Sequence, residues 1–247
     1  MPDSHVHMRA LIALLLILGP FALPTQAQPV TVFAAASLRG ALTEISEGYG
    51  AEVTLSFAGS GTLARQIAAG APVDAVVLAH RDWADWLGTQ GLILPDTLRD
   101  IAGGRLVLIG APDAAPLDTP DAANLMTALD GGRMAIGQRD GVPAGIYARE
   151  WLQTIGAWDA LLPHLAETDN VRAALALVAQ GAAPLGVVYA SDAVAEPRVA
   201  ILYAVPEAAH SPIRYPAAAV TDAGRGFVEY LATPAAAAIF AEHGFAP

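Results

Sequence analysis

The sequence of 247 residues contains no lysine and no cysteine. Its 13 basic residues are all arginines, set against 24 aspartates and glutamates, so the formal net charge is −11. A charge of this sign repels nucleic acids and anionic membrane surfaces, and we therefore expect no nucleic-acid partner. The lack of cysteine excludes disulfides, thiolate catalysis and cysteine-ligated zinc or iron–sulfur centres. The lack of lysine excludes a P-loop, whose phosphate-binding lysine is obligatory.

Long apolar runs are also scarce, and the longest stands near the N-terminus. Residues 8–28 read MRALIALLLILGPFALPTQAQ, with an apolar core at Ala10–Leu18 and small residues at Thr25 and Ala27. This pattern predicts a secretory signal peptide over residues 1–27, cleaved after Ala27. The apolar core is shorter than the roughly 20 residues of a membrane span. An uncleaved membrane anchor, or a true start at Met8, stays open.

Beyond the signal peptide, short apolar runs alternate with helical patterns. The strand-like runs lie at 30–34, 53–58, 74–79, 105–112, 133–137 and 199–206. Such alternation predicts an α/β fold with mainly parallel sheets flanked by helices. The pattern restarts after a Pro- and Asp-rich stretch that ends at Pro120, which favours two lobes facing a cleft. We expect residues 28–109 and 206–247 to form lobe 1 and residues 110–205 to form lobe 2.

The stretch GSGTLA, Gly59–Ala64, follows one of these strands and allows two enzymatic interpretations. It fits the dinucleotide fingerprint G-x-G-x-x-[GA], with Asp82 nearly at the place of the acidic residue. The match is short, however, and an exported protein has little access to a nicotinamide cofactor. Alternatively, Ser60 on a tight turn indicates a secreted serine hydrolase, although the frame G-x-S-x-G and a triad signature are missing. That alternative stays open, because sequence does not fix the order of a triad.

Four predicted helices begin directly after a strand, two in each half of the chain. Ser37 and Ser60 stand at the first two helix starts, residues 143–145 open the third, and Asn170 caps the fourth near Val171. Each start directs free N–H groups and the positive end of the helix dipole outward. If the four starts converge across a cleft, they form a site for a small, highly charged anion.

Six longer stretches carry a resemblance to a known family. They are VTVFAAASL (30–38), SFAGSGTLARQIAAGAP (56–72), GVPAGIYA (141–148), GAWDALLPHLA (156–166), DNVRAALALV (169–178) and APLGVVYASDAVA (183–195). Together they resemble the periplasmic molybdate-binding proteins of ABC transporters, and they cover essentially all of the chain after the signal peptide.

The resemblance implies a two-lobed, type II periplasmic binding protein-like fold that closes on molybdate or tungstate. It implies Ser37 and Ser60 as hydroxyl and amide donors of lobe 1. It likewise implies Ala144 and Val171 as amide donors of lobe 2, and Tyr189 as a phenol donor. No catalytic residue, cofactor or metal site is implied, since molybdenum is bound only as molybdate through these residues. The implied protein is a periplasmic monomer, not an enzyme, and its partner is an ABC permease in the inner membrane.

The sequence departs from the family pattern at a few positions. Gly59 and Gly61 flank Ser60 where the family often has serine, which removes auxiliary hydroxyls. His80 stands where the family usually has a short polar or acidic residue. The two glycines leave the position of the site intact but bear on its affinity, whereas no consequence follows from His80.

The charge of the ligand limits which oxyanions are expected. A lining of donors alone favours an oxyanion without a proton, because a proton on the ligand would meet no acceptor. This disfavours phosphate but not sulfate, and a receptor for another small oxyanion therefore stays open. The arginines near the motifs, Arg39, Arg65 and Arg172, are predicted to face solvent.

Overall fold

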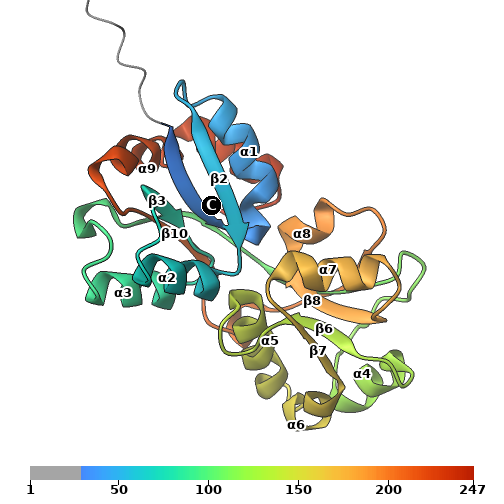
Figure 1. The fold of residues 1–247 in the computed structure, drawn as a ribbon. Coiled ribbons are helices and arrows are strands. Elements are labelled where there is room, and N and C mark those ends of the chain that lie inside the picture. Colours follow the sequence, from blue (N-terminus) through green and yellow to red (C-terminus); the bar gives the residue numbers. More distant parts are fainter. Residues whose placement is uncertain (1–28) are drawn as a thin grey trace, which may run out of the picture.

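The computed structural model describes residues 29–247, which form two lobes with one five-stranded sheet each (Figure 1). The predicted signal peptide, residues 1–27, lies outside the described residues. The strand order of the first sheet is β2 (Val53–Ala58), β1 (Val30–Ala35), β3 (Ala75–Val77), β10 (Arg214–Ala219) and β4 (Arg99–Gly103). The order of the second sheet is β7 (Leu165–Thr168), β6 (Met134–Gly137), β8 (Leu185–Tyr189), β5 (Leu106–Gly110) and β9 (Ala200–Ala204).

Both sheets are mainly parallel. In the first, β1 runs parallel to β2 and β3, while β10 runs antiparallel to β3 and β4. In the second, β6 runs parallel to β7 and β8, while β5 runs antiparallel to β8 and β9. Each sheet thus has one strand opposed to the other four described strands. The predicted α/β class, with two lobes of helix-flanked, mainly parallel sheets, is confirmed.

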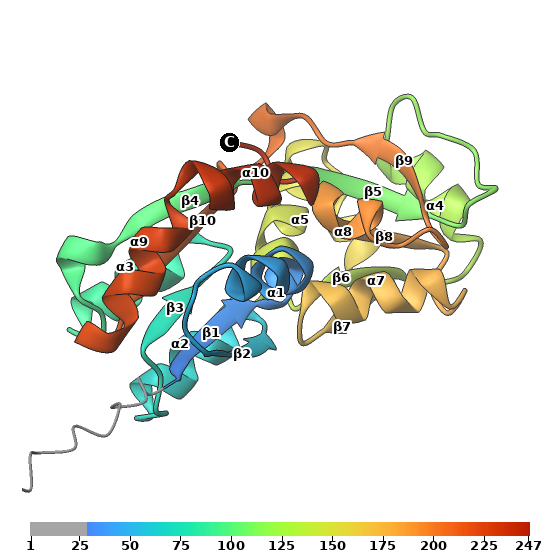
Figure 2. The ribbon, with the colours of Figure 1, turned by 90° about the horizontal axis from the view of Figure 1, so that it is seen from above.

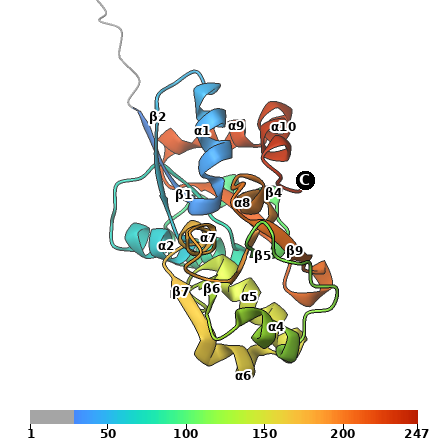
Figure 3. The same cartoon turned by 90° about the vertical axis from the view of Figure 1, so that its right-hand side faces the viewer.

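Helices cover both faces of the sheets, as the alternating pattern predicts. The first lobe contains α1 (Arg39–Glu47), α2 (Ser60–Ala68), α3 (Arg81–Thr89), α9 (Arg225–Leu231) and α10 (Pro234–Glu242). The second contains α4 (Ala122–Leu129), α5 (Pro143–Thr154), α6 (Trp158–Leu161), α7 (Val171–Ala179) and α8 (Ala190–Val194). Figure 3 shows α1, α9 and α10 lying together on one side of the first sheet. Within residues 29–247, no helix has the length and apolarity that a bilayer crossing demands.

The short central strand β3 shows how the sequence divides the core of the first lobe. Val76 packs in a cluster with Leu63 and Ile67 of α2, while its neighbour Val77 packs with Leu42 of α1. Successive side chains of a strand point to opposite faces, so a strand buried on both sides is apolar throughout. This explains the continuous apolar run from Ala75 through Ala79.

The chain crosses between the lobes twice, from β4 to β5 and from β9 to β10 (Figure 2). The predicted boundary after residue 109 assigned β5 to the first lobe, and this is wrong, because β5 pairs with β8 and β9 of the second sheet. The first crossing therefore lies between Gly103 and Leu106. Strand β4 reads RDIAG and has little apolar pattern, so the sequence alone indicates the apolar β5 as the last strand of the first lobe.

Candidate functional site

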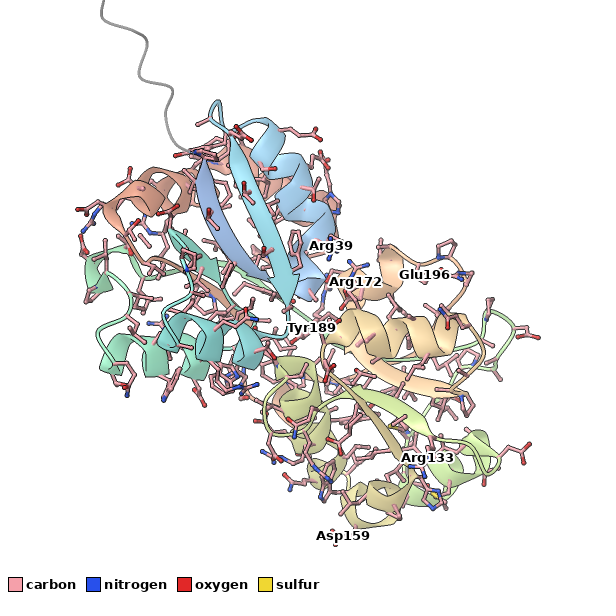
Figure 4. All side chains as sticks on the ribbon, viewed as in Figure 1. Arg39, Arg133, Asp159, Arg172, Tyr189 and Glu196 are labelled. Atoms are coloured by element: carbon pink, nitrogen blue, oxygen red, sulfur yellow. The ribbon has the colours of Figure 1, made fainter. Side chains whose placement is uncertain are left out.

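A small cavity lies between the lobes, where several helices begin. Its volume is about 10 Å³, which is roughly the space for one water molecule. All five residues of the predicted site line this cavity: Ser37, Ser60, Ala144, Val171 and Tyr189. Figure 4 places Tyr189 at the junction between the two lobes. The structure thus brings the five residues together, while their role as ligand-binding residues stays a prediction.

The helices α2 and α5 present uncapped starts to the cavity. Gly59 is the N-cap of α2 and Val142 is the N-cap of α5, and neither helix has a side-chain capping hydrogen bond. Because the first amides of a helix have no partner within it, those of Ser60 and Ala144 are available to a ligand. Pro143 occupies the first turn of α5, where its missing N–H costs no hydrogen bond.

The start of α7 is capped in a way that also leaves a donor free. The side chain of Asn170 accepts a hydrogen bond from the amide of Ala173 at 3.1 Å. The cap therefore occupies the third amide of the helix and leaves the first, that of Val171, facing the cavity. Asn170 itself also lines the cavity.

The hydroxyl groups of the site are buried and differ in their bonding. Ser60 Oγ accepts a hydrogen bond from the amide of Ala79 at 3.0 Å. Its own proton is therefore free to point at a ligand. Ser37 Oγ and Tyr189 Oη are buried without a hydrogen-bond partner. Since an unpartnered buried hydroxyl is costly, both indicate a place where a polar ligand is bound.

Burial also keeps the phenol of Tyr189 in its donor form. Tyr189 is 1 % exposed, and this burial raises its pKa well above the usual value. The neutral phenol keeps its proton and therefore acts as a hydrogen-bond donor.

Tyr147 of α5 joins the two lobes beside the cavity. Its hydroxyl donates to the carbonyl of Ala79 at 3.3 Å, and its ring stacks on His80 with centroids 4.9 Å apart. Burial lowers the pKa of His80, against the opposing effect of Asp82, so the imidazole is held neutral. The sequence did not single out Tyr147, because a tyrosine inside a helix carries no signal of a contact across a cleft.

The two glycines beside Ser60 allow the lobes to approach backbone to backbone. A Cβ atom at Gly59 would collide with the carbonyl oxygen of Asp169, and one at Gly61 would collide with that of Gly141. Both carbonyls belong to the second lobe. A side chain at either position therefore requires a wider separation of the lobes than this structure has.

Comparison with known proteins places this arrangement in a family. The model of the bacterial extracellular solute-binding proteins matches residues 30–246. The chain belongs to this family. The molybdate-binding protein ModA of Escherichia coli is 44 % identical over 226 residues, which are 87 % of this chain and 88 % of that protein.

Solved structures agree with this assignment. The substrate-binding domain of a putative molybdenum ABC transporter from Clostridium difficile is 32 % identical with a TM-score of 0.65, over 88 % of this chain and 98 % of that one. The periplasmic molybdate-binding protein of Azotobacter vinelandii has a TM-score of 0.76 at 23 % identity, over 88 % and 99 %. The latter shows the shared fold.

One arginine of this solute-binding protein lies close to the cleft but outside its lining. Arg172 of α7 pairs with Asp192, at 2.6 Å between Nε and Oδ1, and donates to the carbonyl of Ser37 at 3.5 Å. Asp192 is fully buried and also accepts from the amide of Tyr189 at 3.4 Å. The predicted solvent-facing role of Arg172 is therefore wrong. Its side chain is 28 % exposed because it reaches a buried carboxylate and the opposite lobe.

The other two arginines near the motifs do face solvent, as predicted. Arg39 lies over the ring of Phe57 and Arg65 over that of Trp83, at 4.4 and 5.7 Å from the ring centroids. None of the described residues that line the cavity carries a charged side chain. Among residues 29–247 there is also no cluster of His, Asp and Glu that could hold a metal ion. The solute-binding protein thus offers oriented neutral donors in its cleft.

Proposed function

We propose that this solute-binding protein captures molybdate, and tungstate by the same chemistry, in the cleft between its lobes and delivers it to an ABC importer. One observation carries the proposal: hydroxyls and helix-start amides from both lobes line a single cavity that has no charged side chain among its described lining. The names of its relatives, the molybdate-binding protein of Escherichia coli among them, support molybdate as the ligand.

Neutral donors suffice to bind a dianion in an acidic protein. A buried dianion loses its hydration, which fixed hydrogen bonds must replace. Each hydrogen bond to a charged group contributes about 1.5–3 kcal/mol, and a helix N-terminus contributes up to about 2 kcal/mol. The net charge of −11 acts from a distance and is screened by salt over about 8–10 Å. Local dipoles therefore outweigh the overall charge.

Selectivity follows from the protonation state and the size of the ligand. Molybdate and tungstate carry no proton at neutral pH, so every donor of the cleft meets an acceptor. Phosphate carries a proton, and a lining whose hydroxyls and amides turn their protons to the ligand offers that proton no dedicated acceptor. Sulfate carries none, and its rejection must come from the dimensions of the closed cleft.

Binding requires the lobes to separate and close again. The donors that line the cavity belong to both lobes, so an oxyanion reaches all of them only if it enters between separated lobes that then close on it. Because the donors come from both lobes, the oxyanion favours the closed arrangement by its higher affinity for it. An ABC permease in the inner membrane would recognise that closed form.

We further propose that the protein acts in the periplasm as a monomer and is not an enzyme. A serine hydrolase would need a base within hydrogen-bond reach of Ser60. Ser60 Oγ instead accepts from the amide of Ala79, while Nδ1 of His80 accepts from the amide of Asp82 and its ring stacks on Tyr147. Labelling of Ser60 by an activated-serine probe would overturn this part of the proposal.

Isothermal titration calorimetry tests the ligand. The mature protein is titrated in turn with molybdate, tungstate, sulfate and phosphate. We expect saturable binding of the first two at one site per chain. If only sulfate or phosphate gives a binding signal, molybdate is not the ligand, and the proposed cleft binds a different oxyanion.

A further inference from the structure

Tyr215 is a buried tyrosine at the cleft that the proposed set of donors does not include. It lies on β10, the strand that returns to the first lobe, and is 0 % exposed. Its hydroxyl has no hydrogen-bond partner. Its ring packs edge-on against Tyr189, with centroids 5.9 Å apart, and against Phe245 at 5.1 Å. A buried phenol without a partner at this place needs an explanation.

The local backbone fixes the direction of this side chain. The pairing of β10 with β4 shifts register between Tyr215 and Pro216. Such a bulge bends the strand and redirects a side chain, and the following proline restricts the residue before it to extended conformations. The phenol is therefore held against the junction of the lobes rather than in the regular sheet.

The hydroxyl of Ser37 resembles that of Tyr215, because it is also buried and has no hydrogen-bond partner. Burial raises the pKa of the Tyr215 phenol, and the nearby Ser37 hydroxyl opposes that rise. The carboxylate of Asp192 is also near, but Arg172 and the amide of Tyr189 already engage it. Neither hydroxyl has a hydrogen-bond partner in this structure, and Tyr215 packs on Tyr189, which lines the same cavity as Ser37.

The bonding of Ser60 shows what Ser37 lacks. A serine hydroxyl has one proton to donate and lone pairs that accept. At Ser60 the amide of Ala79 donates to the oxygen, so the proton is left for the ligand. Ser37 has no such donor in this structure. Its lone pairs would therefore stay unpaired when its hydroxyl donates to a bound anion.

We propose that Tyr215 is a positioning residue whose hydroxyl donates a hydrogen bond to Ser37 Oγ when the cleft binds its oxyanion. The chain of hydrogen bonds then runs from Tyr215 Oη to Ser37 Oγ and from Ser37 to the oxyanion, and each bond polarises the next. Tyr215 does not touch the ligand and acts only through Ser37. This inference rests on the proposed function, in which Ser37 is a donor to the oxyanion.

The test is a double-mutant cycle with molybdate as the titrant. The variants are Tyr215→Phe, Ser37→Ala and the two combined, with Tyr203→Phe as the control, since Tyr203 stacks on Trp151 away from the cleft. We expect Tyr215→Phe to weaken binding about five- to tenfold, and the control to leave it unchanged. The double variant should bind no more weakly than Ser37→Ala, because Tyr215 has nothing to act through once the serine is gone.

A second readout separates positioning from a general structural role. Since the phenol has no partner without ligand, Tyr215→Phe should keep the thermal unfolding midpoint of the ligand-free protein and reduce only its rise with molybdate. The inference, but not the proposed function, would be overturned if the losses of affinity in the two single variants added up in the double variant. It would likewise be overturned if Ser37→Ala weakened binding and Tyr215→Phe did not. Failure of the unsubstituted protein to bind molybdate would overturn the proposed function and the inference with it.

Discussion

Two hydroxyls of the cleft, those of Ser60 and Tyr189, have different bonding without ligand, and this difference can be measured. Ser60→Ala leaves the buried amide of Ala79 without its acceptor, which costs about 1–3 kcal/mol of unfolding free energy. Tyr189→Phe removes a hydroxyl that has no partner, so we expect no loss of stability. Both variants should weaken molybdate binding by about 1–3 kcal/mol.

Urea unfolding and calorimetry of the two variants check this prediction together. Unchanged affinity in both variants would discredit the assignment of the site. A loss of stability in Tyr189→Phe equal to that in Ser60→Ala would show that the phenol has a partner in the ligand-free protein.

The buried carboxyl group of Asp192 predicts a pH dependence of stability. Burial raises its pKa to about 6 from the ordinary 3.8, against the opposing effect of Arg172. Because the folded-state pKa is the higher one, the stabilisation is complete below the ordinary pKa and is lost as the pH rises through about 6. Asp192→Asn removes this titration.

We therefore compare the free energy of unfolding of the unsubstituted protein with that of the Asp192→Asn variant. The difference, unsubstituted minus variant, should fall by up to a few kcal/mol between about pH 4 and 7. Urea denaturation across that range measures it. A difference that grows with pH would mean that Arg172 outweighs burial and keeps the carboxylate ionised.

At the scale of residues, the sequence predicted which side chains gather at the cleft but not how they are supported. Ser37, Ser60 and Tyr189 stand in long motifs at strand ends, where parallel sheets place functional groups. Tyr147 and Tyr215 are equally buried there, but their neighbours come from distant parts of the chain. No local pattern marks such a contact.

At the scale of elements, we expect the start of α7 to couple helix stability to binding. The side chain of Asn170 caps this helix through the amide of Ala173. Asn170→Ala should cost about 1 kcal/mol of stability, and also weaken molybdate binding because the first turn, with the amide of Val171, becomes less ordered. Thr233 caps α10 through the amide of Ala236 at 3.3 Å, away from the cleft, and Thr233→Ala is the matched control.

Thermal unfolding and calorimetry on both cap variants test this coupling. We expect a similar loss of stability in each and a loss of affinity in Asn170→Ala alone. Equal affinity in the two variants would mean that the start of α7 contributes nothing to the site.

Most of the strands, but not all, could be predicted from the sequence. Six strands were predicted within a residue or two of their observed bounds, because each is an apolar run closed by a turn signal. Strands β4, β7, β8 and β10 are absent from the prediction, and for β10 the reason is Pro216 in RYPAAA, which argues against a central strand. The bulge at Tyr215 accommodates that proline, and its carbonyl still accepts from the amide of Leu78 at 2.9 Å. Only the paired structure reveals this compensation.

At the scale of the whole molecule, contacts between the lobes should control release of the ligand. The hydrogen bond from Tyr147 to the carbonyl of Ala79 exists only while the lobes are together. Tyr147→Phe should raise the dissociation rate of molybdate about two- to tenfold and leave the association rate unchanged. Tyr203→Phe, within the second lobe, is the control.

Stopped-flow tryptophan fluorescence measures both rates. A slower association in Tyr147→Phe, with dissociation unaffected, would show that this contact forms before the oxyanion is bound rather than as the lobes close.

The central claim is that oriented neutral donors from two lobes replace the water around a doubly charged oxyanion. A crystal structure of the protein grown with molybdate tests it most directly. We predict the oxyanion between the lobes, in contact with the hydroxyls of Ser37, Ser60 and Tyr189 and with the amides of Ala144 and Val171. Molybdate bound at another place, or held mainly by arginine guanidinium groups, would contradict the account.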